Sequence, residues 1–252
     1  MLRRYKKLEI RDKVDSIKQQ LKLDSCYGSM KRLRYALESN DYILLFYPFH
    51  RESFSGASFL ANSLKVIVIN SSQSLGRQHY TLAHELGHIV LGHGDTSDET
   101  NIDISKSKEK EADRFAAEFL LPEICIRPYL IKFQRHFFNA VMLIYKISQN
   151  FEVSFEFAYY RVREYTDFKN AEELSIKNTK VTKLAELLNG NLDIYRPTGE
   201  KYLSRELYLN LALEALEKEK ISIGRFFELL NALKKFDEHF DPDEFYNQVR
   251  VK

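Results

Sequence analysis

One short segment of the chain has residues that could hold a metal ion and activate water. In RQHYTLAHELGHIVLGH, His84 and His88 are four residues apart and Glu85 directly follows the first histidine. On a helix this spacing places both imidazoles on one face, one turn apart, where they can share an ion. Water on such an ion has its pKa lowered to about 7, so a nearby carboxylate can take its proton. The pattern predicts zinc-dependent hydrolysis, with two histidine ligands and Glu85 as the general base.

The alternative is a buried helix that carries these polar residues by chance. The helix is otherwise apolar, at Leu82, Ala83, Leu86, Ile89, Val90 and Leu91. It should therefore be largely buried, and two buried histidines without partners would be costly. This cost favours a metal site. A further histidine, His93, would lie about 140° around a continued helix from His88, so we predict that it belongs to the helix end and is not a ligand.

A catalytic zinc normally has three protein ligands, so one more is needed from elsewhere in the chain. The segment KEKEADRFAAEFLLP (108–122) has a buried stripe formed by Ala112, Phe115, Ala116, Phe119 and Leu120. At about 100° per residue, Glu109 lies roughly 50° from the centre of that stripe and Glu111 roughly 110° from it. Glu109 is the predicted ligand, and Glu111 remains the competing one. Asp113, one turn beyond Glu109, is placed to accept the other N–H of a ligand histidine.

The elements that must position these residues are two helices and a small sheet. Helices are predicted at 77–92 and 106–120, and the polar stretch 95–107 between them is expected to be a loop that gates the site. Strands are predicted at 42–49, 59–61 and 66–69, with a turn at 62–63. Further helices are predicted at 2–23, 28–39 and 126–165, and a strand-like piece at Leu192–Tyr195. The fold class expected from this pattern is α+β, predominantly helical, with a sheet in the N-terminal half.

Composition narrows the possible partners. The chain has 252 residues, with 38 Lys and Arg against 36 Asp and Glu, so its charge gives no global reason to expect nucleic acid or an acidic membrane. No window approaches about 18 consecutive apolar residues, so no membrane span is expected. Cys26 and Cys125 are far apart and lack the spacing of a metal site. Reduced cysteines and a cytoplasmic location are therefore the simplest expectation.

The two motifs together resemble those of the ImmA/IrrE family of metallo-endopeptidases. RQHYTLAHELGH is preceded by VIVIN and followed by EKEADRFAAEFLLP, as in that family, and the likeness covers about residues 40–165. Carried over residue by residue, it implies that His84, His88 and Glu109 bind Zn²⁺ and that Glu85 is the general base. The chain departs from the family pattern at Tyr80 and Leu121, where Phe and Met are usual, but both residues keep apolar bulk.

Together with a drop in apolar density after residue 166, the resemblance leads us to expect three parts of the chain. A zincin-like metallopeptidase core would cover 1–125, a helical extension that resembles a helix-turn-helix would cover 126–165, and a mostly helical region would cover 166–252. In the extension, Ser154 is the expected cap of the second helix. The closely spaced aromatic residues there favour packing over contact with DNA, so direct nucleic-acid binding is not expected.

The substrate class is also implied by the resemblance alone. Family members are cytosolic, and several cleave a helix-turn-helix repressor of a mobile element or stress regulon, often encoded nearby. The substrate peptide is expected to lie extended along 65–70, where Val66, Val68 and Asn70 are candidate contacts. The alternative is a zinc-binding regulatory or interaction protein without turnover. It is disfavoured because structural zinc usually has four protein ligands, whereas the sequence offers three.

Overall fold

The computed structural model describes residues 2–50, 53–61, 64–93, 102–136 and 139–249. Its sheet has four strands: β1 (Tyr42–Tyr47), β2 (Gly56–Ala61), β3 (Leu64–Asn70) and β4 (Tyr202–Leu203). Their order is β2-β3-β1-β4. β1 is parallel to β3, whereas β2 pairs antiparallel to β3 and β4 antiparallel to β1. The predicted fold class, α+β and predominantly helical, is confirmed.

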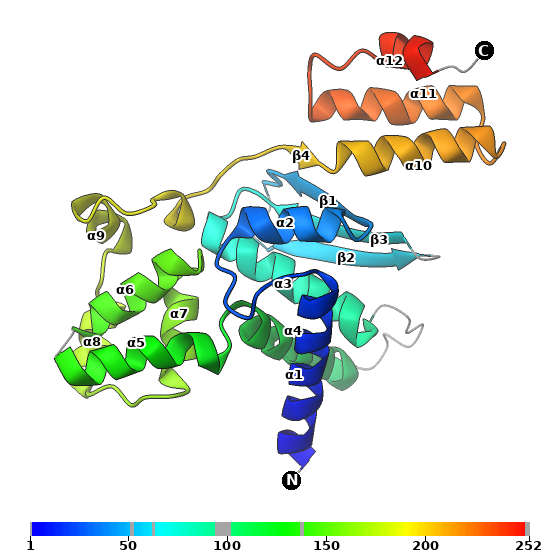
Figure 1. Cartoon of the computed structure of the whole chain (residues 1–252). Coiled ribbons are helices and arrows are strands. Elements are labelled where there is room, and N and C mark those ends of the chain that lie inside the picture. The colour runs from blue at the N-terminus through cyan, green and yellow to red at the C-terminus, as the bar shows by residue number, and fades with distance from the viewer. Residues whose placement is uncertain (1, 51–52, 62–63, 94–101, 137–138, 250–252) are drawn as a thin grey trace.

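Four helices belong to the same half of the chain as β1–β3. They are α1 (Leu2–Gln20), α2 (Met30–Glu38), α3 (Leu75–Leu91) and α4 (Ile102–Leu120). α3 packs on β2 and β3, α4 packs along α3, and α1 packs across α4 (Figure 1). The helix expected from 106 begins at 102, which shortens the loop expected at 95–107; residues 95–101 of that loop lie outside the described residues.

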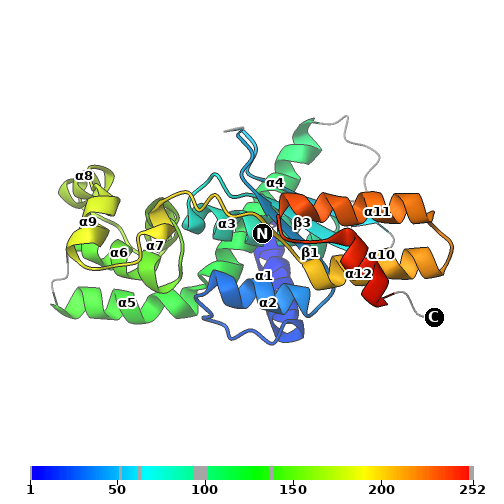
Figure 2. The same cartoon turned by 90° about the horizontal axis from the view of Figure 1, so that it is seen from above.

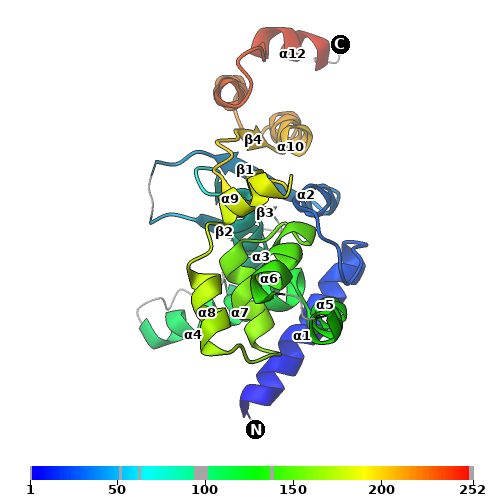
Figure 3. The same ribbon diagram turned by 90° about the vertical axis from the view of Figure 1, so that its left-hand side faces the viewer.

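The remaining helices form two groups on opposite sides of the sheet. One group is α5 (Glu123–His136), α6 (Ala140–Asn150), α7 (Phe155–Arg163), α8 (Asn170–Lys177) and α9 (Val181–Leu187). The other is α10 (Arg205–Glu217), α11 (Ile223–Ala232) and α12 (Pro242–Val249). Figures 2 and 3 show α10–α12 on the side of the sheet away from α3. None of the described helices has the length and apolarity that crossing a bilayer requires.

Alternation along the strands decides which side chains face α3. Ile67 and Ile69 are fully buried, in one core with Leu82 of α3. Because successive strand residues point to opposite faces of a sheet, Val66 and Val68 face away from α3. Asn70 ends β3, and its amide nitrogen donates to Phe54 O at 2.8 Å, which ties the start of β2 to the end of β3.

The hydrophobic cores do not separate at the expected boundary between residues 165 and 166. The main core extends through α8 and α9, where Ile176 and Ala185 are buried. A second core is formed by Leu209, Ala212, Phe226, Leu230 and Leu233. The two cores therefore divide near Ser204, whose hydroxyl accepts from Leu44 N at 2.9 Å. The piece expected to be a strand at Leu192–Tyr195 is wrong: Asp193–Tyr195 is a short 3₁₀ helix (η2), and a second one (η3) covers Leu233–Lys235.

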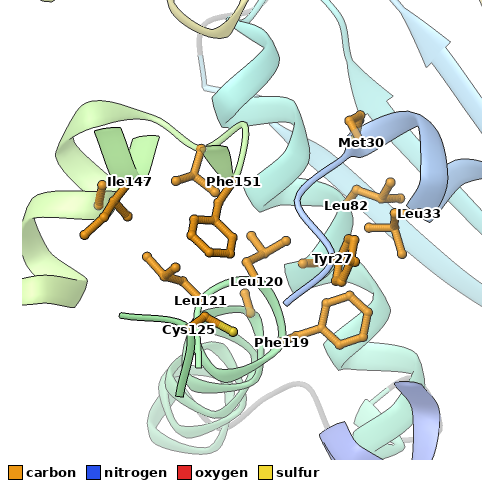
Figure 4. Close-up of a cluster of buried hydrophobic side chains, with 14 of the residues drawn as sticks. Tyr27, Met30, Leu33, Leu82, Phe119, Leu120, Leu121, Cys125, Ile147 and Phe151 are labelled. Atoms are coloured by element: carbon orange, nitrogen blue, oxygen red, sulfur yellow. The ribbon is translucent and has the colours of Figure 1, made fainter. Parts of the chain in front are cut away.

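The part of the main core between α3, α4 and α6 is drawn in Figure 4. Tyr27 meets Phe119 edge to face, with ring centroids 5.5 Å apart. Beside this pair, Cys26 and Cys125 form a disulfide. The expectation of two reduced cysteines is wrong, because the segment between α1 and α2 carries Cys26 against the first turn of α5. The cysteines therefore no longer support a reducing compartment.

The helix-turn-helix-like segment packs mainly through its aromatic residues. Ser154 caps α7 as expected, since its hydroxyl accepts from Phe157 N at 3.1 Å. Phe155 and Tyr159 are buried in the main core, whereas Tyr160 is 57% exposed. The aromatic side chains are thus largely used for packing.

Candidate active site

Helix α3 carries His84 and His88 along one side, and its other side is buried in the core. Leu82, Ala83 and Leu86 are fully buried. The side chains of His84 and His88 are 13% and 17% exposed. Because the apolar residues occupy the core-facing side of the helix, the two imidazoles lie at the border between core and solvent. An ion and a substrate can both reach them there.

Helix α4 approaches α3 closely because of a glycine. A Cβ added to Gly87 would meet three atoms of Phe115 at 3.0–3.2 Å. Gly87 thus gives Phe115 room to pack against α3. Since Glu109 and Asp113 lie on α4 within two turns of Phe115, this close contact brings both carboxylates to the histidines.

Three donor atoms converge between the helices. His84 Nε2 lies 3.2 Å from Glu109 Oε2, and His88 Nε2 lies 3.4 Å from Glu109 Oε1. The two Nε2 atoms are 3.0 Å apart. Ligand bonds of about 2.0–2.1 Å in a tetrahedron put neighbouring ligand atoms roughly 3.3–3.4 Å apart. The donor set, two imidazoles and a carboxylate, and its separations therefore fit a zinc ion.

The far nitrogens of the two imidazoles already have partners. His84 Nδ1 lies 3.0 Å from Asp113 Oδ1, and Tyr80 Oη donates to the same oxygen at 2.6 Å. His88 Nδ1 lies 3.0 Å from His93 Nδ1. When each Nδ1 carries the proton, both Nε2 lone pairs face one point. Two facing lone pairs repel unless a cation lies between them, which is further reason to place an ion there.

The structure separates the two glutamates that compete as the third ligand. Glu109 faces the two Nε2 atoms, as described above. Glu111 instead lies beside His93, with Oε2 3.5 Å from His93 Nε2. Asp113 is in the place expected of it, next to His84. The geometry thus favours Glu109 as the ligand and gives Glu111 a different neighbour.

The general-base candidate borders a cleft of about 360 Å³ in front of the donor atoms. The cleft is lined by Gly56, Ala57, Ser58, Leu60, His84, Glu85, His88, Ile89, His93 and Glu109. Glu85 is only 9% exposed, and Ser58 Oγ donates to its Oε2 at 2.8 Å. Burial raises the pKa of Glu85, which the Ser58 hydrogen bond partly offsets. A raised pKa makes a carboxylate a better proton acceptor.

The pKa values of the ligand candidates follow from burial and from their neighbours. Burial, and then the charge of His84, lower the pKa of His88 to about 4, so this imidazole is neutral at neutral pH. Burial acts to raise the pKa of Asp113, but hydrogen bonds from His84 and Tyr80 outweigh it and hold the pKa below its usual value. Asp113 therefore stays a carboxylate and can accept from both groups.

The expected docking of a peptide on β3 is wrong. β3 pairs with β1 on one side and with β2 on the other, so its backbone has no free edge for an added strand. Val66 and Val68 also face away from α3, and Asn70 is 1% exposed. The edge strand that packs against α3 is β2, and it supplies Gly56 and Ser58 to the cleft.

Sequence reasoning missed Gly56 and Ser58. A Cβ on Gly56 would lie 2.6 Å from Thr81 Cγ2 and 3.4 Å from Glu85 Cγ. The missing side chain therefore lets α3 cross β2 closely enough for Ser58 to reach Glu85. The only signal in the sequence was the spacing of two small residues on one face of a strand, and many strands have such a pair.

Comparison with protein families agrees with this geometry. The model of a peptidase family described as the IrrE N-terminal-like domain matches residues 42–163. Residues 42–163 therefore form a domain of the ImmA/IrrE metallopeptidase type. A search of curated proteins finds no match. The ImmA/IrrE match begins at β1 and ends at the last residue of α7, so it contains β1–β3 and both helices that carry the donor atoms. The activity of this family is that of a metallopeptidase.

Proposed function

We propose that the chain is a zinc-dependent endopeptidase that cleaves a helix-turn-helix transcriptional repressor. The observation that carries the proposal is the joint placement of three donor atoms and a buried base. His84, His88 and Glu109 converge on one point at the cleft, and Glu85 opens onto the same cleft. Family membership supports the peptidase reaction, and the substrate class rests on the family resemblance.

The chemistry that zinc supplies when bound is polarisation of the scissile carbonyl and a lower pKa for the attacking water. The protein contributes proton transfer. The Glu85 carboxylate takes a proton from the water as its oxygen attacks the carbonyl carbon. It then hands that proton to the leaving amine as the C–N bond breaks, so the carboxylate is regenerated. Ser58 holds one carboxylate oxygen at 2.8 Å, which orients the base.

Strand β2 is the proposed docking edge for the substrate. It borders the cleft, and within the described residues its only partner strand is β3. Phe59 and Leu60 are 56% and 37% exposed. An extended peptide can pair with the open backbone of such an edge and set alternate side chains into neighbouring pockets. This arrangement suits a flexible segment of a protein chain. A repressor acts on DNA in the cytoplasm, so the proposal also places the enzyme there.

The substrate is tested by reading the genes that flank the one for this chain and producing a helix-turn-helix repressor encoded there. The zinc-loaded protein is incubated with that repressor and with an unrelated helix-turn-helix protein, and the fragments are identified by mass spectrometry. We expect one defined cut in the neighbouring repressor, its loss after chelation and its return with added zinc. If the protein binds zinc but cuts neither this repressor nor a random peptide library, it is a zinc-binding protein without turnover. If it cuts library peptides but not the repressor, the substrate class is wrong.

Burial and the Ser58 hydroxyl act in opposite directions on the pKa of Glu85, so both shift the acidic limb of the pH profile. Glu85 must be deprotonated to accept a proton, so kcat/KM falls as pH drops through its pKa. The Ser58 hydrogen bond lowers that pKa. In Ser58→Ala the pKa rises, and the acidic limb moves to higher pH. Ser58→Thr keeps the hydroxyl and should keep the wild-type limb. An unchanged profile in Ser58→Ala would show that Glu85 is not the titrating base.

A further inference from the structure

The two histidines at the metal site differ in what supports them. His84 Nδ1 lies directly against a carboxylate of α4, Asp113. His88 Nδ1 lies against another imidazole, that of His93, and His93 Nε2 in turn lies against Glu111 of α4. Helix α4 thus provides the third donor, Glu109, and a carboxylate behind each of the two histidines.

We propose that His93 and Glu111 form a relay that positions His88, which makes His93 a positioning residue of the metal site. The inference rests on the metal site of the proposed function and goes beyond it. When His88 Nε2 faces the ion, its Nδ1 must carry the proton. That N–H donates to His93 Nδ1 at 3.0 Å. His93 Nε2 then carries a proton and directs it to Glu111 Oε2 at 3.5 Å. Every donor in the chain has an acceptor, and the chain ends on a carboxylate.

His93 reaches this position because α3 stops one residue before Gly92. Gly92 has φ 73 and ψ 34, the left-handed conformation, and its N–H bonds back to Ile89 O. A continued helix would have turned His93 away from His88, but the left-handed residue turns it back, so that the ring centroids are 5.1 Å apart. Lys108 Nζ donates to His93 O at 3.2 Å, which fastens this helix end to α4.

The arrangement does not make His93 a further ligand. The contact joins the Nδ1 atoms of His88 and His93, whereas Nε2 of His88 faces Glu109. His93 therefore lies behind His88 as seen from the donor atoms. Its side chain is 8% exposed and that of Glu111 is 28% exposed. A largely buried imidazole that contacts a carboxylate on one side and a ligand candidate on the other has the geometry of an outer support for a metal ligand.

The test compares an apolar and a polar replacement of His93 by their affinity for zinc, measured by competition with a chelating dye. His93→Phe keeps a ring but offers no acceptor, and loss of such a partner lowers metal affinity by about 10- to 100-fold. His93→Asn places Oδ1 where Nδ1 was, so it should restore affinity to within a fewfold of wild type. The visible spectrum of the cobalt-substituted protein should shift in His93→Phe and return toward wild type in His93→Asn.

Zinc affinity reports on the relay whether or not the protein cuts a peptide. Failure of the relay proposal can therefore be told apart from failure of the proposed function. Equal affinity in wild type and His93→Phe would overturn the inference, as would equal losses in His93→Phe and His93→Asn. Should His93→Phe fail to fold, Glu111→Ala, which leaves His93 Nε2 without this acceptor, tests the same relay from its far end on a partly exposed side chain. It should weaken zinc binding, and affinity equal to wild type would overturn the relay.

Discussion

Replacing Glu85 with glutamine is expected to lower the rate of peptide cleavage by about 10²- to 10⁴-fold, the contribution typical of a general base. Glutamine has nearly the shape of glutamate but cannot accept the proton. Glu85 is not one of the three converging donors, so the variant should still bind one zinc ion per chain. The measurement is single-turnover cleavage at saturating enzyme, together with the zinc content of the same sample.

A matched control separates loss of the base from loss of a charge. Glu206→Gln removes an exposed carboxylate on α10, outside the part of the chain that matches the peptidase family, and should leave the rate unchanged. A Glu85→Gln protein that keeps its zinc and cuts at the wild-type rate would show that the base is another group. If Glu85→Gln lost its zinc as well as its activity, the result would assign Glu85 to metal binding.

The second large effect is expected at the third ligand. Glu109→Ala removes the only carboxylate that lies within 3.4 Å of both Nε2 atoms in the described residues. The loss in zinc affinity should exceed the roughly 10- to 100-fold loss expected for an outer partner, and cleavage should be lost at submicromolar zinc. The side chain is 56% exposed, so the protein should fold without it. Circular dichroism and thermal unfolding of the zinc-free protein check this.

Glu111→Ala is the matched variant, since it removes the competing carboxylate two residues along the same helix. It should weaken zinc binding only as far as loss of an outer partner does, so that one ion per chain still binds at micromolar zinc. The decisive result is which of the two variants, Glu109→Ala or Glu111→Ala, loses more zinc affinity. If Glu111→Ala lost the ion and Glu109→Ala kept it, the two assignments would have to be exchanged, and α4 would have to turn relative to α3 in the zinc-bound protein.

The placement of the candidate donor groups was predictable because it depends on spacing within single helices. The distance from His84 to His88 is one turn of α3, and that from Glu109 to Asp113 is one turn of α4. Each pair therefore shares a face whatever the rest of the fold does. The apolar stripe of α4 also set the angle at which Glu109, rather than Glu111, meets α3.

Predictions that reached beyond a single helix or strand depended on contacts that the sequence does not specify. The direction of His93 was extrapolated from a continuous helix, and the left-handed Gly92 ended that helix. The substrate peptide was expected to add a strand along 65–70, but strand order decides which edge is free. That order places β3 inside the sheet and β2 at its edge.

The sequence by itself determined which groups share a helix face: two imidazoles one turn apart on one helix with a carboxylate beside them, and a further carboxylate on the side of a second helix that meets the first. Periodicity carries that information because a helix repeats the same geometry wherever it lies. Tertiary structure alone decided what surrounds these groups, including the contact of Ser58 with Glu85, the pairing of Cys26 with Cys125 and the contact of Glu111 with His93. These contacts join segments whose separation along the chain says nothing about their separation in space. They depend on how closely the elements pack, which small residues such as Gly56 and Gly87 permit.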